Sequence, residues 1–189
     1  RLAAIRAIAP EAFVEGPGGG GIDFAKLKLA LGGAVDEGKE RYGLSWSGNP
    51  GNPYNRDRSI ALAALAPLQK VPGVTFYSLQ KGDAASVSPD APMHLVDLTA
   101  HERDFLDTAA FISHLDLVIT VDTMISALAG ALGAPVWVLL NRVPDWRHHQ
   151  ERPDNPWYPT MRLYRQTRAG EWADVIERVA SDLRLLTPA

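Results

Sequence analysis

Three features that are common in other proteins are missing from this chain. It has no cysteine, which excludes disulfides and thiolate metal sites but leaves the redox compartment open. It has no apolar run approaching the ~20 residues that a membrane-spanning helix needs, and no secretory signal is visible. Its formal net charge is only −3, so no overall field favours nucleic acid or an anionic membrane. We therefore expect a soluble, cytoplasmic protein in which any anionic ligand is bound by a local group of donors.

The composition that remains is that of an ordinary folded domain. Of the 189 residues, 46% are apolar and 22% are charged, which argues against wholesale disorder. A chain of this length supports one well-cored domain and is too short for two full ones.

The first part of the chain differs in composition and residue pattern from the rest. The alanine-rich residues 1–14 predict a short helix, the glycine-rich residues 15–21 indicate a linker, and residues 24–31 predict a second helix. We interpret residues 1–41 as an N-terminal helical and linker segment, and residues 42–189 as the folded domain.

From residue 42 onwards, short apolar runs alternate with helical patterns, which is typical of βαβ units and a parallel sheet. The expected strands are Tyr42–Trp46, Val74–Leu79, Met93–Leu98, Leu117–Val121, Val136–Leu140 and Met161–Tyr164. The expected helices are Ile60–Gln69, Glu102–His114, Thr123–Leu132 and Glu171–Leu185. The fourth and fifth strands are apolar on both alternating faces, as in the covered centre of a sheet. The sequence thus predicts a doubly wound, Rossmann-like α/β fold.

Ligands of such sheets bind beyond the carboxyl ends of the strands, where loops lead into helix N-termini. Those N-termini carry partial positive charge and free N–H groups, which suit a phosphate. The loop after the first strand contains Ser47, Gly48 and Asn49, which are small enough for a ligand to approach the backbone closely. Gly48 is also free to adopt dihedral angles that are barred to other residues.

Basic and capping side chains complete this first loop. Arg56 and Arg58 offer forked donors that match phosphate oxygens, and Ser59 is a suitable N-cap for the helix that follows. The alternative is a turn-rich loop with two solvated arginines. The residues alone leave both interpretations open.

Two further loops have a similar character. Gln80 and Lys81 follow the second strand; a lysine there suits a diphosphate and a glutamine suits a base or ribose, although a plain polar loop is the alternative. The fourth strand ends at Asp122, Thr123 is expected to cap the next helix, and the N–H groups of Thr123 and Met124 would point at a phosphate bound there. Capping and phosphate binding are compatible. Neither the glycine-rich dinucleotide fingerprint nor a P-loop occurs.

These loops, taken in order, resemble the C-terminal domain of glycosyltransferase family 9, the heptosyltransferase-like group. Within that group the chain is most similar to bacterial proteins in which the domain follows tetratricopeptide repeats. The resemblance covers roughly residues 42–185. It is carried by GLSWSGNP with RDRSI (Gly43–Ile60), FYSLQKG (Phe76–Gly82), DFLDTAAFISHLDLVITVDT (Asp104–Thr123), LAGALGAPVWVLL (Leu128–Leu140), PDWR (Pro144–Arg147) and PWYPTMRLYRQ (Pro156–Gln166).

The resemblance implies a GT-B architecture, in which two Rossmann-like domains face a cleft and the C-terminal one binds a nucleoside-diphosphate sugar. Members of the family look like inverting transferases that need no metal and no cofactor. An acceptor hydroxyl, on a glycan, lipid or protein, displaces the nucleoside diphosphate in line. A helix dipole and basic side chains stabilise the charge of the leaving group, which is electrostatic preorganisation.

The resemblance also implies a role for each residue of the three loops. It assigns the diphosphate cradle to Asp122, Thr123 and Met124, the border of the sugar and phosphates to Ser47, Gly48 and Asn49, cationic support to Arg56 and Arg58, and contacts with the nucleotide to Gln80 and Lys81.

The chain departs from the family pattern at two positions. Family sequences commonly carry a histidine four residues after the threonine of the DT motif, where this chain has Ala127, and many carry one after GNPx, where this chain has Asn52. The family's general base is expected on the N-terminal domain, so no catalytic base is named here. A non-catalytic binding or scaffolding module is therefore the alternative function, and repeats or a second Rossmann-like half are expected upstream.

The loop after the fifth strand holds further polar residues. Asp145, Trp146 and Arg147 follow a strand and are candidates for lining the donor cleft. His148 and His149 are adjacent to them, but neighbouring histidines tend to point in different directions and no third ligand recurs at a recognised metal spacing. We therefore expect no metal site.

The remaining candidates have plainer interpretations. Trp157 and Tyr158 are expected to pack the last loop against the sheet, and residues 102–107 to form a solvated helix face. A nucleotide-sugar isomerase on the same architecture would need an acid and a base in the cleft, for which Asp122 and Asp145 are the visible candidates.

Overall fold

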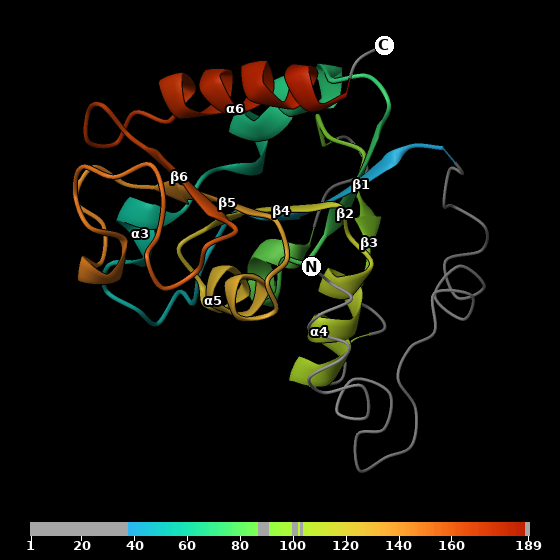
Figure 1. Ribbon diagram of the computed structural model, residues 1–189, viewed down its shortest axis with the longest axis horizontal. Helices are drawn as coiled ribbons and strands as arrows, with labels where there is room; N and C mark the ends of the chain where they lie inside the picture. The colour runs from blue at the N-terminus through green and yellow to red at the C-terminus, as the bar shows by residue number, and fades with distance from the viewer. Residues whose placement is uncertain (1–37, 87–90, 100–101, 103, 188–189) are drawn as a thin grey trace.

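A six-stranded parallel sheet runs through the part of the chain that the computed structural model describes, which is residues 38–86, 91–99, 102 and 104–187 (Figure 1). The helices and linker expected before residue 38 lie outside the described residues. The strands are β1 (Glu40–Ser45), β2 (Val74–Ser78), β3 (Val96–Asp97), β4 (Leu117–Val121), β5 (Val136–Leu140) and β6 (Met161–Arg165). Each of the six expected strands is present, and β4 and β5 have the expected bounds.

The strand order is β3-β2-β1-β4-β5-β6, and every neighbouring pair is parallel. This is the order of a doubly wound Rossmann-like sheet, so the predicted fold class is confirmed. The chain direction across the sheet reverses between β1 and β4. In such sheets the crevice beyond the carboxyl ends of the two strands at the reversal is the place where ligands bind.

Helices cover both faces of the sheet, as Figure 1 shows. Residues of α4 (Phe105–Ser113) and α5 (Met124–Ala131) belong to the hydrophobic core on one face. Residues of the 3₁₀ helix η1 (Leu62–Lys70) and of α6 (Ala173–Leu186) belong to the core on the other face. The shorter helices are α3 (Asn55–Arg58), η2 (Gly82–Ala85) and η4 (Trp146–His148).

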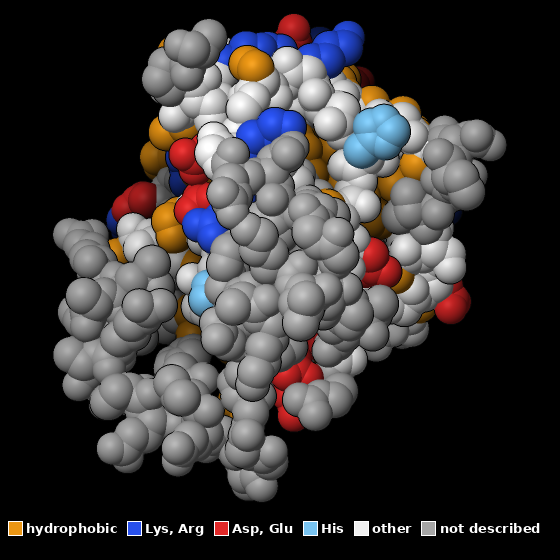
Figure 2. Space-filling model, turned by 90° about the vertical axis from the view of Figure 1, so that its right-hand side faces the viewer, with side chains coloured by type: hydrophobic (Ala, Val, Ile, Leu, Met, Phe, Trp, Pro, Cys, Tyr) orange, Lys and Arg blue, Asp and Glu red, His pale blue; other side chains and the backbone are white. Residues whose placement is uncertain are grey.

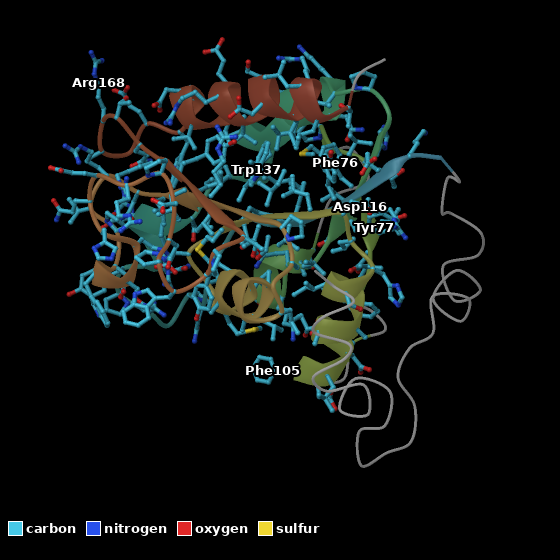
Figure 3. The ribbon with its side chains drawn as sticks, viewed as in Figure 1. Phe76, Tyr77, Phe105, Asp116, Trp137 and Arg168 are labelled. Atoms are coloured by element: carbon cyan, nitrogen blue, oxygen red, sulfur yellow. The ribbon has the colours of Figure 1, made fainter. Side chains whose placement is uncertain are left out.

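The alternation of side chains along each strand supplies both cores. Phe76 and Trp137 lie between the sheet and α6, whereas Tyr77, the next residue after Phe76, belongs to the core on the opposite face (Figure 3). All five residues of β4 and all five of β5 are buried. Burial on both faces explains why these strands read as continuous apolar runs.

Two elements differ from the sequence-based expectation. The helix expected over residues 60–69 is the 3₁₀ helix η1, which contains Pro67. Proline has no N–H to donate and its ring obstructs the carbonyl four residues earlier, so an α-helix is disfavoured there. The strand expected over residues 93–98 is reduced to Val96 and Asp97, because only this segment pairs with β2.

The caps of two helices also differ from expectation. Ser59 follows α3 as its C-cap and does not cap η1, whose N-cap is Ala61. The helix expected from Glu102 begins instead at Phe105, because the Asp104 carboxylate accepts hydrogen bonds from the N–H groups of Leu106 and Asp107. These bonds satisfy donors that a helix N-terminus leaves free.

Gly130 allows α5 to pack closely against the last loop. A Cβ atom at Gly130 would lie 2.6 Å from Cγ and 2.9 Å from Cβ of Tyr158, so the base of that side chain would have to move. Tyr158 thus packs as expected, whereas Trp157 is 62% exposed, and its expected packing against the sheet is wrong.

We expect Gly130→Ala to lower the free energy of unfolding by about 1–3 kcal/mol, because overpacking forces the tyrosine out of place. Chemical denaturation measures the change. The control is the same substitution in a Tyr158→Ala background, where alanine is expected to stabilise α5 by up to ~1 kcal/mol through its helix propensity. An equal effect in both backgrounds would contradict this account.

The surface of the described residues is mixed in charge. On the face in Figure 2, acidic and basic side chains are interspersed where the chain is described. None of the helices within the described ranges has the length and apolar character that a membrane crossing requires.

Candidate functional site

The three loops singled out in the sequence meet in one pocket of about 460 Å³ at the carboxyl edge of the sheet. This volume is within the range of small-molecule sites. The pocket lies at the reversal of the sheet, because residues that end or follow β1 and β4 both line it. Its lining comprises Ser45, Ser47, Gly48, Asn49, Pro50, Arg58, Leu79, Gln80, Lys81, Gly82, Asp122, Thr123, Met124, Ile125, Ala127 and Arg147.

The first loop is built tightly around Gly48. A Cβ at this position would lie 2.6 Å from Asn55 Oδ1 and 2.9 Å from Arg58 Nη2. The φ angle of Gly48 is not in the positive region, so the loop does not use the positive-φ conformations that are open to glycine. The ends of the Asn55 and Arg58 side chains occupy the space of a Cβ and would have to move to admit one. Ser47 Oγ lies 3.1 Å from Ser59 Oγ, which joins the two ends of the loop.

The structure separates the two arginines of this loop. Arg58 is partly buried and lines the pocket, whereas Arg56 is exposed and does not line it. Within the described ranges, the Arg58 side chain has no ion pair, and its buried Nε has no hydrogen-bond partner. A partly buried guanidinium with unused donors retains binding capacity for an anion. The structure thus brings Arg58, and not Arg56, to the pocket, and cationic support for a ligand stays a prediction.

Gln80 is buried, and its side-chain amide bonds to the protein. Its Oε1 accepts hydrogen bonds from the N–H of Trp46 (2.8 Å), the N–H of Ser47 (2.8 Å) and Ser45 Oγ (3.3 Å). Its Nε2 donates to the carbonyls of Ser47 and Lys81, both at 3.0 Å. These bonds use both amide hydrogens. Gln80 thus joins the first loop to the second, and the amide has no donor left for the predicted contact with a nucleotide.

Lys81 lines the pocket but forms an ion pair with Glu102. Its Nζ lies 2.6 Å from Glu102 Oε1 and 5.6 Å from the centre of the Phe105 ring. Burial raises the pKa of Glu102 above its usual range, although the pairing with Lys81 opposes that shift. The sequence predicted a solvated helix face over residues 102–107. In the structure the Glu102 carboxyl and Asp107 are buried, so these two residues are not part of such a face. The charge of Lys81 is therefore largely used within the protein.

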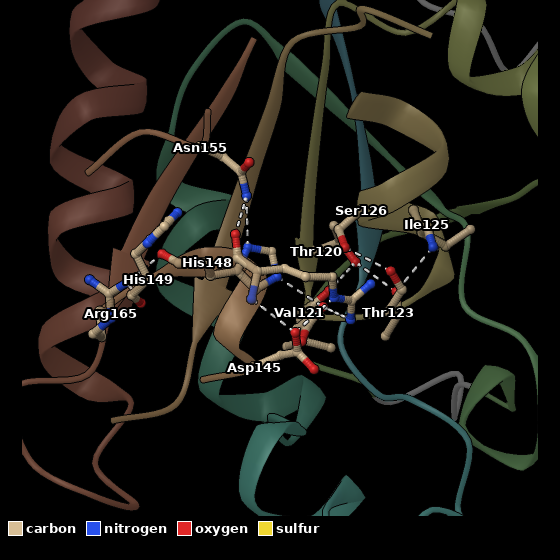
Figure 4. Close-up of polar contacts among 12 residues, drawn as sticks. Thr120, Val121, Thr123, Ile125, Ser126, Asp145, His148, His149, Asn155 and Arg165 are labelled. Carbon is tan, nitrogen blue, oxygen red and sulfur yellow. Dashed lines mark hydrogen bonds and ion pairs between the residues drawn. The ribbon is translucent and has the colours of Figure 1, made fainter. Parts of the chain in front are cut away.

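The step from β4 to α5 forms the third wall of the pocket. Thr123 is the N-cap of α5, as predicted, because its Oγ1 accepts a hydrogen bond from the N–H of Ile125 at 3.2 Å (Figure 4). Ser126 Oγ donates to the Thr123 carbonyl at 2.7 Å. Met124 is the first residue of α5 and is partly exposed beside the pocket. The arrangement leaves the N-terminal end of α5 at the pocket wall.

The buried imidazole of His148 lies beside the Asp122 carboxylate. The side chain of Asn155 lies 3.1 Å from Nδ1 of His148, and an amide N–H donated to Nδ1 leaves the imidazole proton on Nε2. Nε2 lies 3.1 Å from Asp122 Oδ1 in a bent contact that lacks hydrogen-bond geometry. The sequence carries no signal for this network, because His148 and Asn155 are far from Asp122 along the chain. No cluster of three or more metal-binding side chains occurs among the described residues.

In the loop after β5, Arg147 lines the pocket, and Asp145 and Trp146 do not. The predicted cleft-lining role of these two residues stays a prediction. Trp146 is 74% exposed. The Asp145 carboxylate accepts a hydrogen bond from Arg147 Nε at 2.7 Å. Burial alone raises the pKa of Asp145, but the hydrogen bonds from Arg147 outweigh it, and the pKa of this carboxyl lies below its usual range.

Hydrogen bonds from Asn155 and Arg165 hold the segment that carries Arg147 in place. His149 has φ 53° and ψ −178°, a backbone conformation that is costly for any residue except glycine. Arg165 Nη2 donates hydrogen bonds to the carbonyls of His148 and His149, at 3.2 Å and 2.9 Å. Asn155 Nδ2 donates to the Arg147 carbonyl at 3.2 Å. These bonds offset the backbone strain and hold η4 against the end of the sheet.

Comparison with known proteins gives one partial likeness. No family model matches the chain. Protein FlbA of Caulobacter vibrioides is 31% identical over 153 residues, which are 76% of this chain and 25% of that protein. The chain thus spans about a quarter of the length of the curated relative it matches. The name of that relative states no activity.

Proposed function

We propose that this chain is the donor-binding domain of a family 9-like glycosyltransferase, which transfers a sugar from a nucleoside-diphosphate sugar to an acceptor hydroxyl with inversion. The observation that carries the proposal is the partly buried Arg58, which has no ion pair with the described residues and faces a pocket at the reversal of the sheet. The N-terminal end of α5 at Thr123 is part of the same pocket.

The physical basis is the charge of the leaving group. In such a transfer the acceptor oxygen forms a bond to the anomeric carbon, and the bond from that carbon to the diphosphate breaks with its electron pair going to the diphosphate. Free N–H groups of a helix N-terminus and a guanidinium stabilise that charge as it develops. Arg58 and α5 supply both kinds of donor. The proton of the acceptor hydroxyl goes to a base that we do not assign to this chain.

The proposal extends to partners. A GT-B transferase needs a second Rossmann-like domain to bind the acceptor, and tetratricopeptide repeats precede the donor domain in the bacterial family 9-like proteins that the sequence resembles. The partial match to a much longer protein is compatible with either arrangement. The proposed substrate is a nucleoside-diphosphate sugar, without a cofactor, and the acceptor class is left open.

Calorimetric titration of the chain with UDP, GDP and ADP and with their sugar conjugates tests the proposal. We expect at least one nucleoside diphosphate to bind with a Kd below about 1 mM, an affinity that a few charge-assisted hydrogen bonds provide. The corresponding nucleoside is the control and is expected to bind more weakly. No binding by any of these compounds at millimolar concentration would contradict the proposal.

The second candidate is a donor-binding module without transferase activity. It is favoured by Ala127, which lines the pocket at the position where the family commonly has a histidine. Asn52 is less informative, because its Oδ1 accepts a hydrogen bond from the N–H of Tyr54 in a local turn and it does not line the pocket. Donor binding by a longer protein containing this domain, with neither sugar transfer nor donor hydrolysis even after Ala127→His, would support this second function.

A further inference from the structure

Two arginines from loops that follow different strands line the same pocket. The strand β4 lies between β1 and β5 in the sheet. Arg58 follows β1 along the chain, and Arg147 follows β5. Both line the same pocket, together with Asp122 and Thr123 at the end of β4. The pocket at the N-terminal end of α5 is thus also lined by one arginine from the segment after β1 and one from the segment after β5.

Asp145 orients the Arg147 side chain, but most of the N–H donors of its guanidinium have no partner among the described residues. Its Nε donates to Asp145, which is outside the pocket lining, and its Nη2 lies 4.0 Å from Asp122 Oδ1. Neither Nη1 nor Nη2 donates a hydrogen bond to the described residues. A guanidinium has five N–H donors in a planar fork, so most of its donors remain for a ligand. The anchoring of η4 by Asn155 and Arg165 holds the backbone of Arg147 in place.

The two arginines differ in the charges that surround them. Lys81 is paired with Glu102. Asp122 is the one carboxylate among the lining residues, and the arginine that pairs with it is Arg147, whose Nη2 lies 4.0 Å from Asp122 Oδ1. A phosphate group bound beside Arg147 would meet the negative charge of Asp122, and the Arg147 guanidinium offsets that charge. Arg58 and the N-terminal end of α5 offer donors to one phosphate, and the unused donors of Arg147 are available to a second one.

We infer that Arg58 and Arg147 form a two-arginine clamp that selects a diphosphate over a monophosphate, with Arg147 binding the second phosphate group. This inference deepens the proposed function and rests on it. Asp145 keeps the Arg147 fork oriented in the absence of ligand and competes with the second phosphate for its donors.

Titration of the full chain with inorganic pyrophosphate and with inorganic phosphate tests the clamp without any contribution from a nucleotide base. We expect Arg147→Gln to weaken pyrophosphate binding about 10-fold and phosphate binding no more than about 2-fold, since one charge-assisted contact is lost only with the longer anion. Asp145→Asn is expected to keep or tighten pyrophosphate binding.

The matched control is Arg152→Gln. Arg152 pairs with Asp154 at 2.7 Å, and its side chain is 49% exposed, against 47% for that of Arg147. It does not line the pocket, and its loss is expected to leave both affinities unchanged.

The outcomes separate the clamp from the proposed function. An Arg147→Gln chain that binds pyrophosphate like the wild type, or that loses phosphate and pyrophosphate affinity equally, overturns the clamp while nucleoside diphosphates still bind. A wild-type chain that binds neither pyrophosphate nor any nucleoside diphosphate overturns both. Thermal melts check that the variants are folded. Arg147→Lys provides a second measurement, in which retained charge without the fork is expected to give an intermediate loss of pyrophosphate affinity.

Discussion

Replacing Gln80 by leucine is expected to lower the free energy of unfolding by about 3–5 kcal/mol. The substitution keeps most of the side-chain volume but removes an amide that makes five hydrogen bonds. The backbone N–H groups of Trp46 and Ser47 then lose their acceptor in a partly buried loop, and each unsatisfied group costs about 1–3 kcal/mol. Because this amide joins two walls of the pocket, we also expect weaker binding of pyrophosphate.

Urea denaturation of the Gln80→Leu chain measures this effect. Gln69→Leu is the matched control, because Gln69 accepts a single hydrogen bond, from the N–H of His94 at 3.0 Å. Its loss is expected to cost less than about 1.5 kcal/mol. Equal destabilisation by the two substitutions would show that the amide of Gln80 does not hold the loops together.

Replacing Arg58 by glutamine is expected to weaken the binding of a nucleoside diphosphate by about 10- to 100-fold, which corresponds to the loss of one or two charge-assisted hydrogen bonds. Arg58 lines the pocket and has no ion pair with a described residue, so its charge is available to a ligand. The effect is expected to be larger than that of Arg147→Gln, because the charge of Arg147 is already partly offset by Asp145, whereas Arg58 has no ion pair with a described residue.

Arg56→Gln is the matched control for this experiment. Arg56 is the same residue type two positions away, but it is exposed and does not line the pocket. Its replacement is expected to change the affinity by less than about 2-fold, since exposed charges are screened by salt. A similar loss for both variants would indicate a general charge effect and would contradict the role of Arg58.

The elements of the sheet were predictable because their signals are local. The apolar runs of β4 and β5 are bounded by turn-forming residues, and both strands have the expected bounds. The segment ending at β3 shows the limit of such signals. Its apolar residues do become buried, at Met93 and Leu98, but burial does not require a strand, and only the pairing with β2 decides where β3 begins and ends.

The candidate site was predictable to a lesser degree. The rule that ligands bind beyond the carboxyl ends of parallel strands selected three loops, and those loops share one pocket. The rule did not reveal which side chains in them are free. Arg56 and Arg58 look alike in the sequence, and Gln80 and Lys81 both look available, but only Arg58 lines the pocket without an ion pair or hydrogen bond to a described residue.

By itself the sequence determined the class of the fold, the run of alternating strands and helices, and the three loops at one sheet edge. Hydrophobic periodicity and helix capping depend on residues a few positions apart, so they can be read without coordinates. Only the tertiary structure decided the pairing of Lys81 with Glu102, the placement of His148 beside Asp122, and the presence of Arg147 in the pocket. Each of these contacts joins groups that are distant along the chain. Their closeness in space depends on how whole strands and loops pack together.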